Sequence, residues 1–383
     1  MRRRSVILPM AVISVIILVG AFTALSIGST SSVAKTRTTG IAGMKRPLTG
    51  LIDMGVQTSY APDRPFPTVS TDAITPYAGS FGGIVVNEGW AQLEPTPGHE
   101  KWNDLDASLD AVSTWNTDHP STPVGVKLRI FGGDEAPAWA KTLGGSPITI
   151  ITNGLHRTFG RWWTSPYGQA WSSFQHSLAA RFDRNPLVRA VSVSSCATLT
   201  GEPFVINISR SAIRTMVAAG WTSQAQQRCL QGALADYSGW QHTPITFAFN
   251  RYRTVNDGIP VLDTSVTTEI MKACAQSHAR GGPECVLGNN GLSDTATTGR
   301  SASVYSEIDS LWSKTSGHVG VYFQTFDERV DCGNIAAAID HHAKAVEVWP
   351  PNHAYKGFSG IPAATLRQWN DALQAGRALS CAV

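Results

Sequence analysis

Two glutamates in this sequence have the type and setting that acid–base chemistry requires. Glu202 lies in the stretch TGEPF, and Glu347 lies in the stretch AVEVWP. Cleavage of a glycosidic bond needs one carboxylic acid that protonates the leaving oxygen and a second carboxylate that attacks carbon or activates water. The two residues can cooperate only if the elements that carry them bring both to one site.

Those elements are short apolar runs that alternate with helical patterns. The runs, each predicted to be a strand, span 50–56, 82–90, 123–130, 188–195, 244–250, 284–290, 319–326 and 345–350. Helical stripes lie at 102–116, 165–183, 222–238, 265–279, 301–315 and 362–375, whereas the first crossover, 56–82, carries little periodicity. Eight such units predict a single (β/α)8 barrel of the α/β class with long βα loops, rather than a doubly wound open sheet.

A barrel of parallel strands builds its active site from the loops at the C-terminal strand ends. Glu202 lies just beyond the fourth predicted strand, which suits a general acid/base. Glu347 lies within the eighth predicted strand, where alternation places it on the same face as Trp349, directed at the barrel axis. A charge that points into a barrel is costly unless it is paired or functional, so Glu347 is the predicted nucleophile.

The seventh predicted strand offers an alternative second carboxylate. Gln324 occupies its inward end, and the loop acids Asp327 and Glu328 follow just beyond. Either loop acid could replace Glu347, and a site without a second carboxylate is the remaining alternative.

Other polar and aromatic residues at the strand ends are the predicted substrate-binding groups. They are Glu88, Trp90, Arg129, Trp139, Trp163, Asn250, Asn289, Gln324 and Trp349. Arg129 and Glu88 are expected to support the catalytic carboxylates, because an arginine keeps a nearby carboxylate ionised; a structural ion pair is the alternative. Loop tryptophans can stack on sugar rings. The tryptophans on helical stripes are expected in the core: Trp102, Trp115, Trp171 and Trp369.

Three stretches together resemble a known superfamily. GWAQLEPTPGHEKWNDLD is similar to the run after strand two of clan A-like glycoside hydrolases, the β-galactosidase and cellulase type. LRIFGGDEAPAWA resembles their arginine-bearing third strand, and the run from WWTSPYGQAW to GEPF resembles their third helix, fourth strand and acid/base motif. The resemblance covers 82–204 and continues more weakly to Ala372. It implies a TIM barrel, hydrolysis of O-glycosidic bonds in an oligo- or polysaccharide, and an acid/base role for Glu202.

The sequence departs from this pattern at two positions. Gly201 stands where many relatives carry an asparagine that binds the sugar 2-hydroxyl, so Asn250 or Asn289 is expected to make that contact, or else it is absent. Relatives place the nucleophile at the end of strand seven, where this chain has Gln324. With Glu347 as nucleophile, the expected mechanism is a retaining double displacement. The alternative is a non-catalytic carbohydrate-binding barrel at the cell surface.

The N-terminus has the features of an export signal. MRRR precedes an uncharged run, 5–28, and a Ser/Thr-rich stretch that ends at Ala34. The segment suits a cleaved signal peptide, and its apolar run is also long enough for a retained membrane anchor. The predicted organisation is a signal peptide or signal anchor at 1–34, a flexible segment at 35–48 and a catalytic domain at 49–383, secreted or anchored facing outward.

Charge and cysteine usage narrow the partners. A net charge of +3 gives no support for nucleic-acid binding, and the expected partner is a carbohydrate. Six cysteines in an exported chain can form three disulfides, for which Cys274–Cys285 and Cys332–Cys381 are the predicted pairs and free buried thiols the alternative. The sequence has no CxxC, GxSxG, P-loop or strand-associated GxGxxG motif, so no metal or cofactor is expected.

Overall fold

The computed structural model describes residues 43–55, 65–152, 154–205, 208–256, 259–293, 299, 301–326, 330–351 and 357–381. They belong to one compact unit, Gly40–Val383. Among these residues no helix is long and apolar enough to cross a bilayer. The predicted export segment, 1–34, lies outside the described residues.

Eight parallel strands close into a barrel in the order β1-β12-β11-β10-β7-β6-β3-β2. They are β1 (Gly50–Asp53), β2 (Gly83–Gly89), β3 (Gly125–Phe131), β6 (Val188–Ser192), β7 (Ile245–Ala248), β10 (Cys285–Leu292), β11 (Val321–Thr325) and β12 (Ala345–Val348). Each coincides with one predicted strand. The (β/α)8 fold is therefore confirmed, and the open sheet is excluded.

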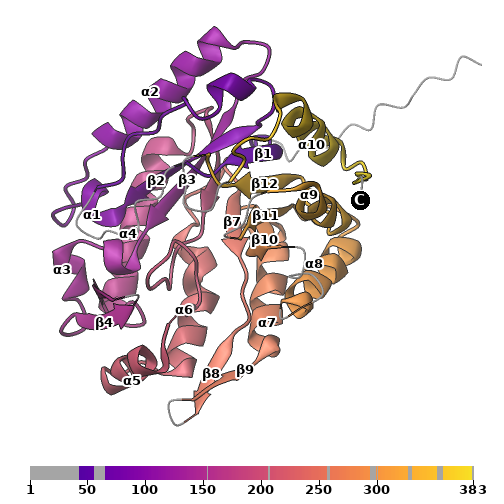
Figure 1. Cartoon of the computed structure of the whole chain (residues 1–383). Coiled ribbons are helices and arrows are strands. Elements are labelled where there is room, and N and C mark those ends of the chain that lie inside the picture. Colours follow the sequence, from indigo (N-terminus) through magenta and orange to yellow (C-terminus); the bar gives the residue numbers. More distant parts are fainter. Residues whose placement is uncertain are drawn as a thin grey trace, which may run out of the picture. The chain divides into compact units, whose positions relative to one another are not determined.

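Helices surround these strands (Figure 1). All six predicted stripes form helices: α2 (Asn103–Asp118), α4 (Ser165–Phe182), α6 (Ser223–Asp236), α7 (Thr264–Ala275), α8 (Ala302–Lys314) and α10 (Ala363–Ala375). A further helix, α9 (Cys332–Asp340), was not predicted. The shorter elements are η1 (Thr75–Tyr77), α1 (Trp90–Leu93), η2 (Gly133–Glu135), α3 (Ala138–Lys141) and η3 (His278–Arg280). In the weak first crossover, the described part, 65–82, holds the short turn η1 as its helical element.

Three insertions follow the carboxyl ends of consecutive barrel strands. The hairpin of β4 (Ile148–Thr152) and β5 (Leu155–Phe159) follows β3, helix α5 (Arg210–Ala218) follows β6, and the hairpin of β8 (Arg253–Asn256) and β9 (Ile259–Leu262) follows β7. The sequence predicted loops at these places. Because segments after parallel strands lie at one end of a barrel, all three share the face on which Glu202 is carried.

The barrel interior changes from apolar to polar along its axis. One end is filled by a buried cluster of Leu48, Ile52, Val85, Ala190, Val286, Tyr322 and Ala345. The next inward positions toward the carboxyl ends carry polar groups, including Lys127 on β3 and Glu347 on β12. The larger core lies between the strands and the helices. Polar side chains are thus concentrated toward the end where a barrel builds its site.

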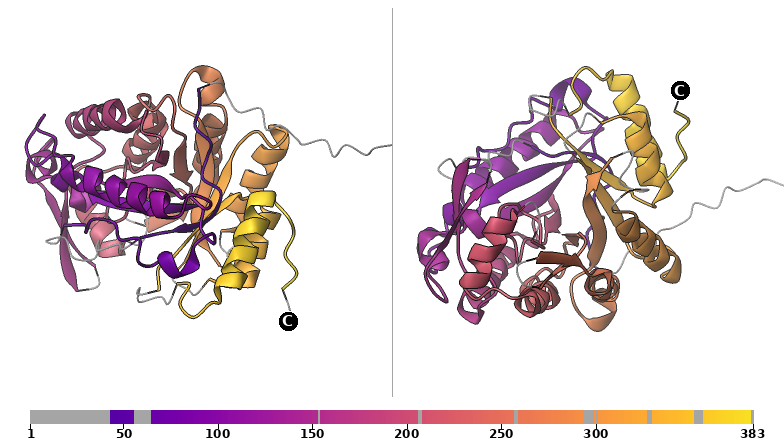
Figure 2. Two further views of the ribbon diagram at one scale, coloured as in Figure 1. Left: turned by 90° about the horizontal axis from the view of Figure 1, so that it is seen from above. Right: turned by 60° about the horizontal axis from the view of Figure 1, so that its bottom comes forward.

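The first and last elements of the barrel lie side by side. β1 pairs with β12, with Gly50 opposite Ala345, and the Leu51 amide donates to the Asn370 Oδ1 atom of α10 at 3.0 Å. Figure 2 shows the C-terminal helix, in yellow, beside the indigo segment near the start of the described chain.

Three disulfides join Cys196 to Cys229, Cys274 to Cys285 and Cys332 to Cys381. Both predicted pairs are confirmed, and free thiols are excluded. The closed barrel, its helices and all three disulfides lie within the unit Gly40–Val383.

Candidate active site

Glu347 is the centre of a buried ionic cluster inside the barrel. It is 1% exposed, and its Oε1 and Oε2 atoms form ion pairs with Lys127 and Arg129, respectively. Both cations lie on β3, two residues apart on the inward face, so the predicted inward direction of Glu347 is confirmed. Burial alone would raise the pKa of Glu347, but Arg129 and Lys127 together lower it below its ordinary value. Glu347 is therefore an ionised carboxylate.

Lys127 is held by an aromatic ring as well as by Glu347. Its Nζ atom lies 3.9 Å from the centroid of the Tyr322 ring. That ring packs directly over Gly288, where an added Cβ would lie 2.1 Å from it, so this position requires glycine. Burial lowers the pKa of Lys127 to about 8, although Glu347 opposes the change. Lys127 is thus a cation at neutral pH and loses its charge in mildly alkaline solution.

Glu202 has the opposite electrostatic setting. The Asn250 Nδ2 atom donates to its Oε2 atom at 3.0 Å, and Asn290 provides a second side-chain hydrogen bond. Burial raises the pKa of Glu202, an effect that these bonds and the charge of Arg129 reduce but do not cancel. The negative charge of Glu347 adds to the rise. Glu202 therefore keeps its proton to a higher pH than an ordinary glutamate, as a general acid must.

Arg129 connects the two halves of the site. Besides pairing with Glu347, its Nη2 atom donates to the Gln324 Oε1 atom at 3.2 Å. The backbone at Gly201, just before Glu202, packs against the aliphatic part of the Arg129 side chain. A Cβ added at Gly201 would lie 3.1 Å from the Arg129 Cδ atom. A side chain at position 201 would crowd Arg129, so packing accounts for the departure at Gly201.

Glu88, a predicted site residue, lies on the outer face of β2. Glu88 is in register with Ile130, whereas its neighbour Asn87 is in register with the inward Arg129. Glu88 is fully buried, and neither of its carboxyl oxygens has a hydrogen-bond partner among the described residues. Burial, assisted by the charge of Asp104 on α2, raises the pKa of Glu88 to about 8. Glu88 is therefore separate from the cluster.

Asn289 also turns away from the cluster. Its Nδ2 atom donates to the Phe249 carbonyl at 2.7 Å, and its Oδ1 atom accepts from the Tyr305 hydroxyl of α8. Its neighbour Asn290 points inward, to Glu202 and to the Tyr322 hydroxyl. Of the two asparagines proposed from sequence for the sugar contact, Asn250 alone lies with Glu202.

Trp90, Trp139 and Trp163, which the sequence predicted as substrate-binding groups, pack against other tryptophans. Trp90 is fully buried against Trp139 and Trp171, with its Nε1 atom bound to Glu94. Trp163 packs against Trp162, with ring centroids 5.1 Å apart. On the helical stripes, Trp115, Trp171 and Trp369 are buried and Trp102 packs against the core, as predicted.

Trp349 remains beside the cluster. It follows Glu347 by two residues, and its Nε1 atom donates to the carbonyls of Thr325 and Phe326 at the end of β11. The alternative acids Asp327 and Glu328 lie outside the described residues.

Lys127, Tyr322 and Asn290 are site residues that the sequence reasoning missed. Lys127 was detectable, because it shares strand parity with Arg129 and a buried inward glutamate requires more than one partner. The inward position of Asn290 had no such signal, because two asparagines are adjacent in β10.

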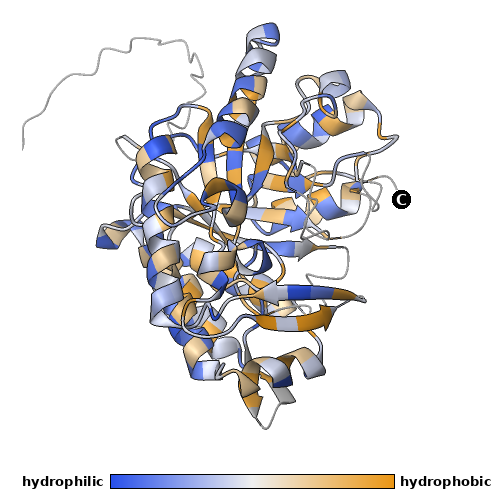
Figure 3. Ribbon diagram, turned by 90° about the vertical axis from the view of Figure 1, so that its left-hand side faces the viewer, coloured by the Kyte–Doolittle hydropathy of each residue, from blue (hydrophilic) through white to orange (hydrophobic). Residues whose placement is uncertain are grey.

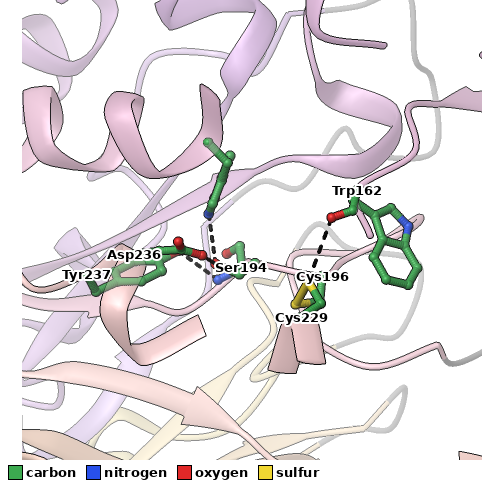
Figure 4. The surroundings of a disulfide bond; sticks show 8 residues. Trp162, Ser194, Cys196, Cys229, Asp236 and Tyr237 are labelled. Carbon is green, nitrogen blue, oxygen red and sulfur yellow. Dashed lines mark hydrogen bonds between the residues drawn. A yellow bond between two sulfur atoms is a disulfide. The ribbon is translucent and has the colours of Figure 1, made fainter. Parts of the chain in front are cut away.

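The loop that carries Glu202 is anchored at its start. The Cys196–Cys229 disulfide joins this loop to α6, and the Cys229 Sγ atom lies 3.8 Å from the Trp162 carbonyl oxygen (Figure 4). The Ser195 hydroxyl donates to Asp236 at 2.6 Å, and the Ser194 amide donates to the Tyr237 hydroxyl at 2.8 Å. These contacts fix residues 194–196, at the start of the segment that leads to Glu202.

A cavity of about 20 Å³ lies beside this anchor, lined by Trp162, Tyr167, Trp171, Ser195 and Asp236 among others. It is large enough for one water molecule. Neither Glu202 nor Glu347 lines it, so it belongs to the anchor rather than to the carboxylate cluster. Within the described residues, no group of three or more His, Cys, Asp or Glu side chains could hold a metal ion.

The chain resembles known proteins in structure but not in overall sequence. No family model and no curated protein matches this sequence. Endo-glycoceramidase II from Rhodococcus sp., in its cellobiose-like imidazole complex, aligns with a TM-score of 0.51 at 16% identity, covering 84% of this chain and 78% of that chain. An endogalactoceramidase aligns with a TM-score of 0.44 at 15% identity, covering 88% and 75%. A further glycoside hydrolase aligns with a TM-score of 0.45 at 11% identity, covering 87% and 100%.

At such identities the likeness is one of fold. The chain is a (β/α)8 barrel, and its likeness to endo-glycoceramidase II confirms the resemblance to TIM-barrel glycoside hydrolases at the level of fold.

Proposed function

We propose that this protein is an exported glycosidase that cleaves O-glycosidic bonds by a retaining mechanism with two carboxylates. The observation that carries the proposal is the opposed pKa shift of two glutamates in one cluster: that of Glu202 is raised and that of Glu347 is lowered. Environments that separate two carboxyl groups in this way assign one as the acid and the other as the nucleophile. Both lie at the end of the barrel where such sites form.

In the first step, a Glu347 oxygen bonds to the anomeric carbon while the bond from that carbon to the leaving oxygen breaks. Glu202 gives its proton to the leaving oxygen, and the sugar remains esterified to Glu347. In the second step, Glu202, now ionised, takes a proton from water as the water oxygen attacks the same carbon. The ester bond breaks and Glu347 leaves as a carboxylate.

Neighbouring residues support these roles. Arg129 and Lys127 hold Glu347 ionised before it attacks and stabilise it again as the leaving carboxylate, and Asn250 orients the Glu202 carboxyl group. Gln324 and Trp349 lie at the ends of the adjacent strands β11 and β12, where a bound sugar ring would contact them. Asn250 is the proposed contact for the sugar 2-hydroxyl. The carbohydrate is an oligo- or polysaccharide.

Export is part of the proposal. Three disulfides form readily in an oxidising compartment, and the basic and apolar N-terminal segment suits secretion or outward-facing anchoring. The organisation proposed is a signal peptide or anchor at 1–34, a flexible segment at 35–48 and the barrel at 49–383.

A carbohydrate-binding barrel without turnover is the second candidate. It is favoured by the state of Glu347, whose two oxygens are both ion-paired and which is 1% exposed. A carboxylate saturated in this way can serve to hold Arg129 and Lys127 in place rather than to attack a sugar.

Turnover distinguishes the two candidates. The purified protein is assayed on a panel of plant and bacterial wall glycans, and the anomeric form of the first product is followed by NMR. Hydrolysis with retention, lost in Glu202→Gln and in Glu347→Gln but kept in Asp118→Asn at the exposed end of α2, supports the proposal. Glycan binding without hydrolysis supports the second candidate, and initial release of the opposite anomer excludes retention.

A further inference from the structure

The large hydrophobic side chains that are exposed in the described residues lie on one end of the barrel. They are Ile151, Leu155, Val217, Val261, Leu262 and Phe326, each between 42% and 59% exposed. All six lie on or next to segments that follow the carboxyl ends of barrel strands: the β4–β5 hairpin, α5, the β8–β9 hairpin and the end of β11. Scattered exposure would be unremarkable, but exposure confined to one face indicates a contact surface.

The β4–β5 hairpin presents its apolar residues from a rigid base. Ile148 and Ile150 are buried beneath it, while Ile151 points outward at 59% exposure. Arg157 of β5 forms a buried ion pair with Asp134, which fixes the hairpin to the end of β3. In Figure 3, the isoleucine-rich strand β4 is largely hydrophobic in colour beside the more hydrophilic β5. The exposure of Ile151 is therefore a property of the folded hairpin.

Helix α5 combines apolar and basic side chains on its exposed face. Arg210, Arg214 and Val217 are spaced by four and three residues, so they lie along one side, and all are exposed. The opposite side, with Ile213 and Met216, is buried. α5 contacts β4, and the barrel helix α6 contacts β8. In Figure 1, β4 and α5 lie at the lower left of the molecule and the β8–β9 hairpin lies at its lower end.

The β8–β9 segment, 253–262, carries one charge of each sign, Arg253 and Asp257, but the segments that hold the other two insertions are free of acids. The whole chain has 28 acidic residues, yet 136–182 and 203–235 contain none. Their basic residues are Lys141, Arg157, Arg161, Arg181, Arg210, Arg214 and Arg228. Arg157 and Arg181 pair with carboxylates elsewhere, whereas within the described residues no carboxylate pairs with Arg210 or Arg214. The exposed face of α5, with two arginines and no acids, is complementary to an anionic partner.

We propose that this rim, formed by Ile151, Leu155, Val217, Val261 and Leu262 with Arg210 and Arg214, docks the barrel mouth on an anionic lipid bilayer. Aliphatic side chains on protruding hairpins and a helix can enter the boundary between headgroups and acyl chains. The arginines then meet lipid phosphates, and their unpaired charge favours anionic membranes. Because the rim follows the same strand ends as the Glu202 loop, docking turns the barrel mouth toward the lipid surface.

The test is sedimentation of the unit Gly40–Val383 with vesicles of phosphatidylcholine, with and without an equimolar amount of phosphatidylglycerol. This unit contains the closed barrel and all three disulfides, and it lacks the apolar run 5–28, which would itself bind lipid. We expect binding to the anionic vesicles that weakens with added salt, and much weaker binding to phosphatidylcholine alone. Each arginine is expected to strengthen binding by about fivefold. The double variant Arg210→Gln/Arg214→Gln should therefore bind at least tenfold more weakly. Ile151→Ser/Val217→Ser should weaken it even at low salt.

The matched control is Arg280→Gln/Arg377→Gln, which removes the same charge from exposed positions after α7 and α10, away from the rim. It should bind like the parent, and thermal unfolding of every variant establishes that it is folded. Glu202→Gln should also bind like the parent, which separates docking from hydrolysis. Absence of binding to anionic vesicles overturns the proposal, as does an equal loss in the control or full binding by the rim variants.

Discussion

Lys127 and Glu347 form an ion pair across the interior of the barrel, although β2 and β1 lie between their strands in the sheet order. Arg129 pairs with the other oxygen of the same carboxylate. Two cations from one strand thus hold a single anion from another, and the charge state of that anion depends on both.

Removing Lys127 should therefore shift the acidic limb of the pH–activity profile. In Lys127→Met, Glu347 keeps Arg129 but loses one cation, so its lowered pKa rises toward the ordinary value. The fraction of ionised Glu347 then falls at low pH, and kcat/KM should decline at a higher pH than in the parent. Lys101→Met, at an exposed position before α2, serves as the control. An unchanged acidic limb would exclude Glu347 as the group that limits activity there.

The alkaline limb should depend on Asn250. Its amide stabilises the ionised form of Glu202, so Asn250→Ala should raise the pKa of Glu202 further and move the alkaline limb to higher pH. Because Glu202 also loses its orienting contact, kcat should fall at every pH. Asn103→Ala at the exposed start of α2 should change neither quantity. Movement of the limb to lower pH would contradict the assignment of Glu202 as the acid.

Glu88 should make the protein less stable as the pH rises. In the folded state its carboxyl group keeps its proton to about pH 8, whereas in the unfolded state it ionises near its ordinary value of 4.5. The folded state therefore binds the extra proton between these values, and stability falls across that window by at most about 1.4 kcal/mol per pH unit. The advantage of Glu88→Gln over the parent in urea unfolding should grow from pH 5 to pH 8. A constant difference would mean that Glu88 is ionised in the folded protein.

The disulfide next to Glu202 should matter for activity as well as for stability. Cys196 and Cys229 are 33 residues apart, so loss of their bond in Cys196→Ser/Cys229→Ser should cost about 3–4 kcal/mol in unfolding free energy on chain-entropy grounds. Cys274→Ser/Cys285→Ser removes a bond of similar effect, about 3 kcal/mol, from a place remote from the site. Both should lower the melting temperature, but we expect a clear loss of kcat in the first variant alone. Equal loss in both would argue that the anchor does not position Glu202.

The elements of the barrel could be predicted because their patterns are long and repeated. Eight apolar runs and six helical stripes were enough to predict a closed barrel. The alternation of residues within AVEVWP was enough to predict that the Glu347 side chain points inward. Alternation did not resolve Glu88 or Asn289, because each has a polar neighbour, Asn87 or Asn290, on a strand that is buried on both faces. There the pattern does not distinguish inward from outward, and only the register with adjacent strands decides.

Contacts between distant segments were beyond sequence reasoning. The pairing of Glu347 with two cations on β3, and the packing of Trp90 away from solvent, depend on side chains that are far apart along the chain. The β4–β5 and β8–β9 hairpins were expected to be loops because each strand is short and its turn carries a weak signal. The rim that they form with α5 depends on the placement of three insertions, after β3, β6 and β7, at one end of the barrel.

The pairing of β1 with β12 also determines when the barrel can close. The Gly50 and Leu51 amides find their acceptors in Lys344 and Asn370, near the other end of the sequence. The first strand therefore stays unpaired on that edge until β12 is present, and its Leu51 amide gains its acceptor only with α10. The last strand and the C-terminal helix therefore complete the barrel, and the stability of the first strand depends on the end of the chain.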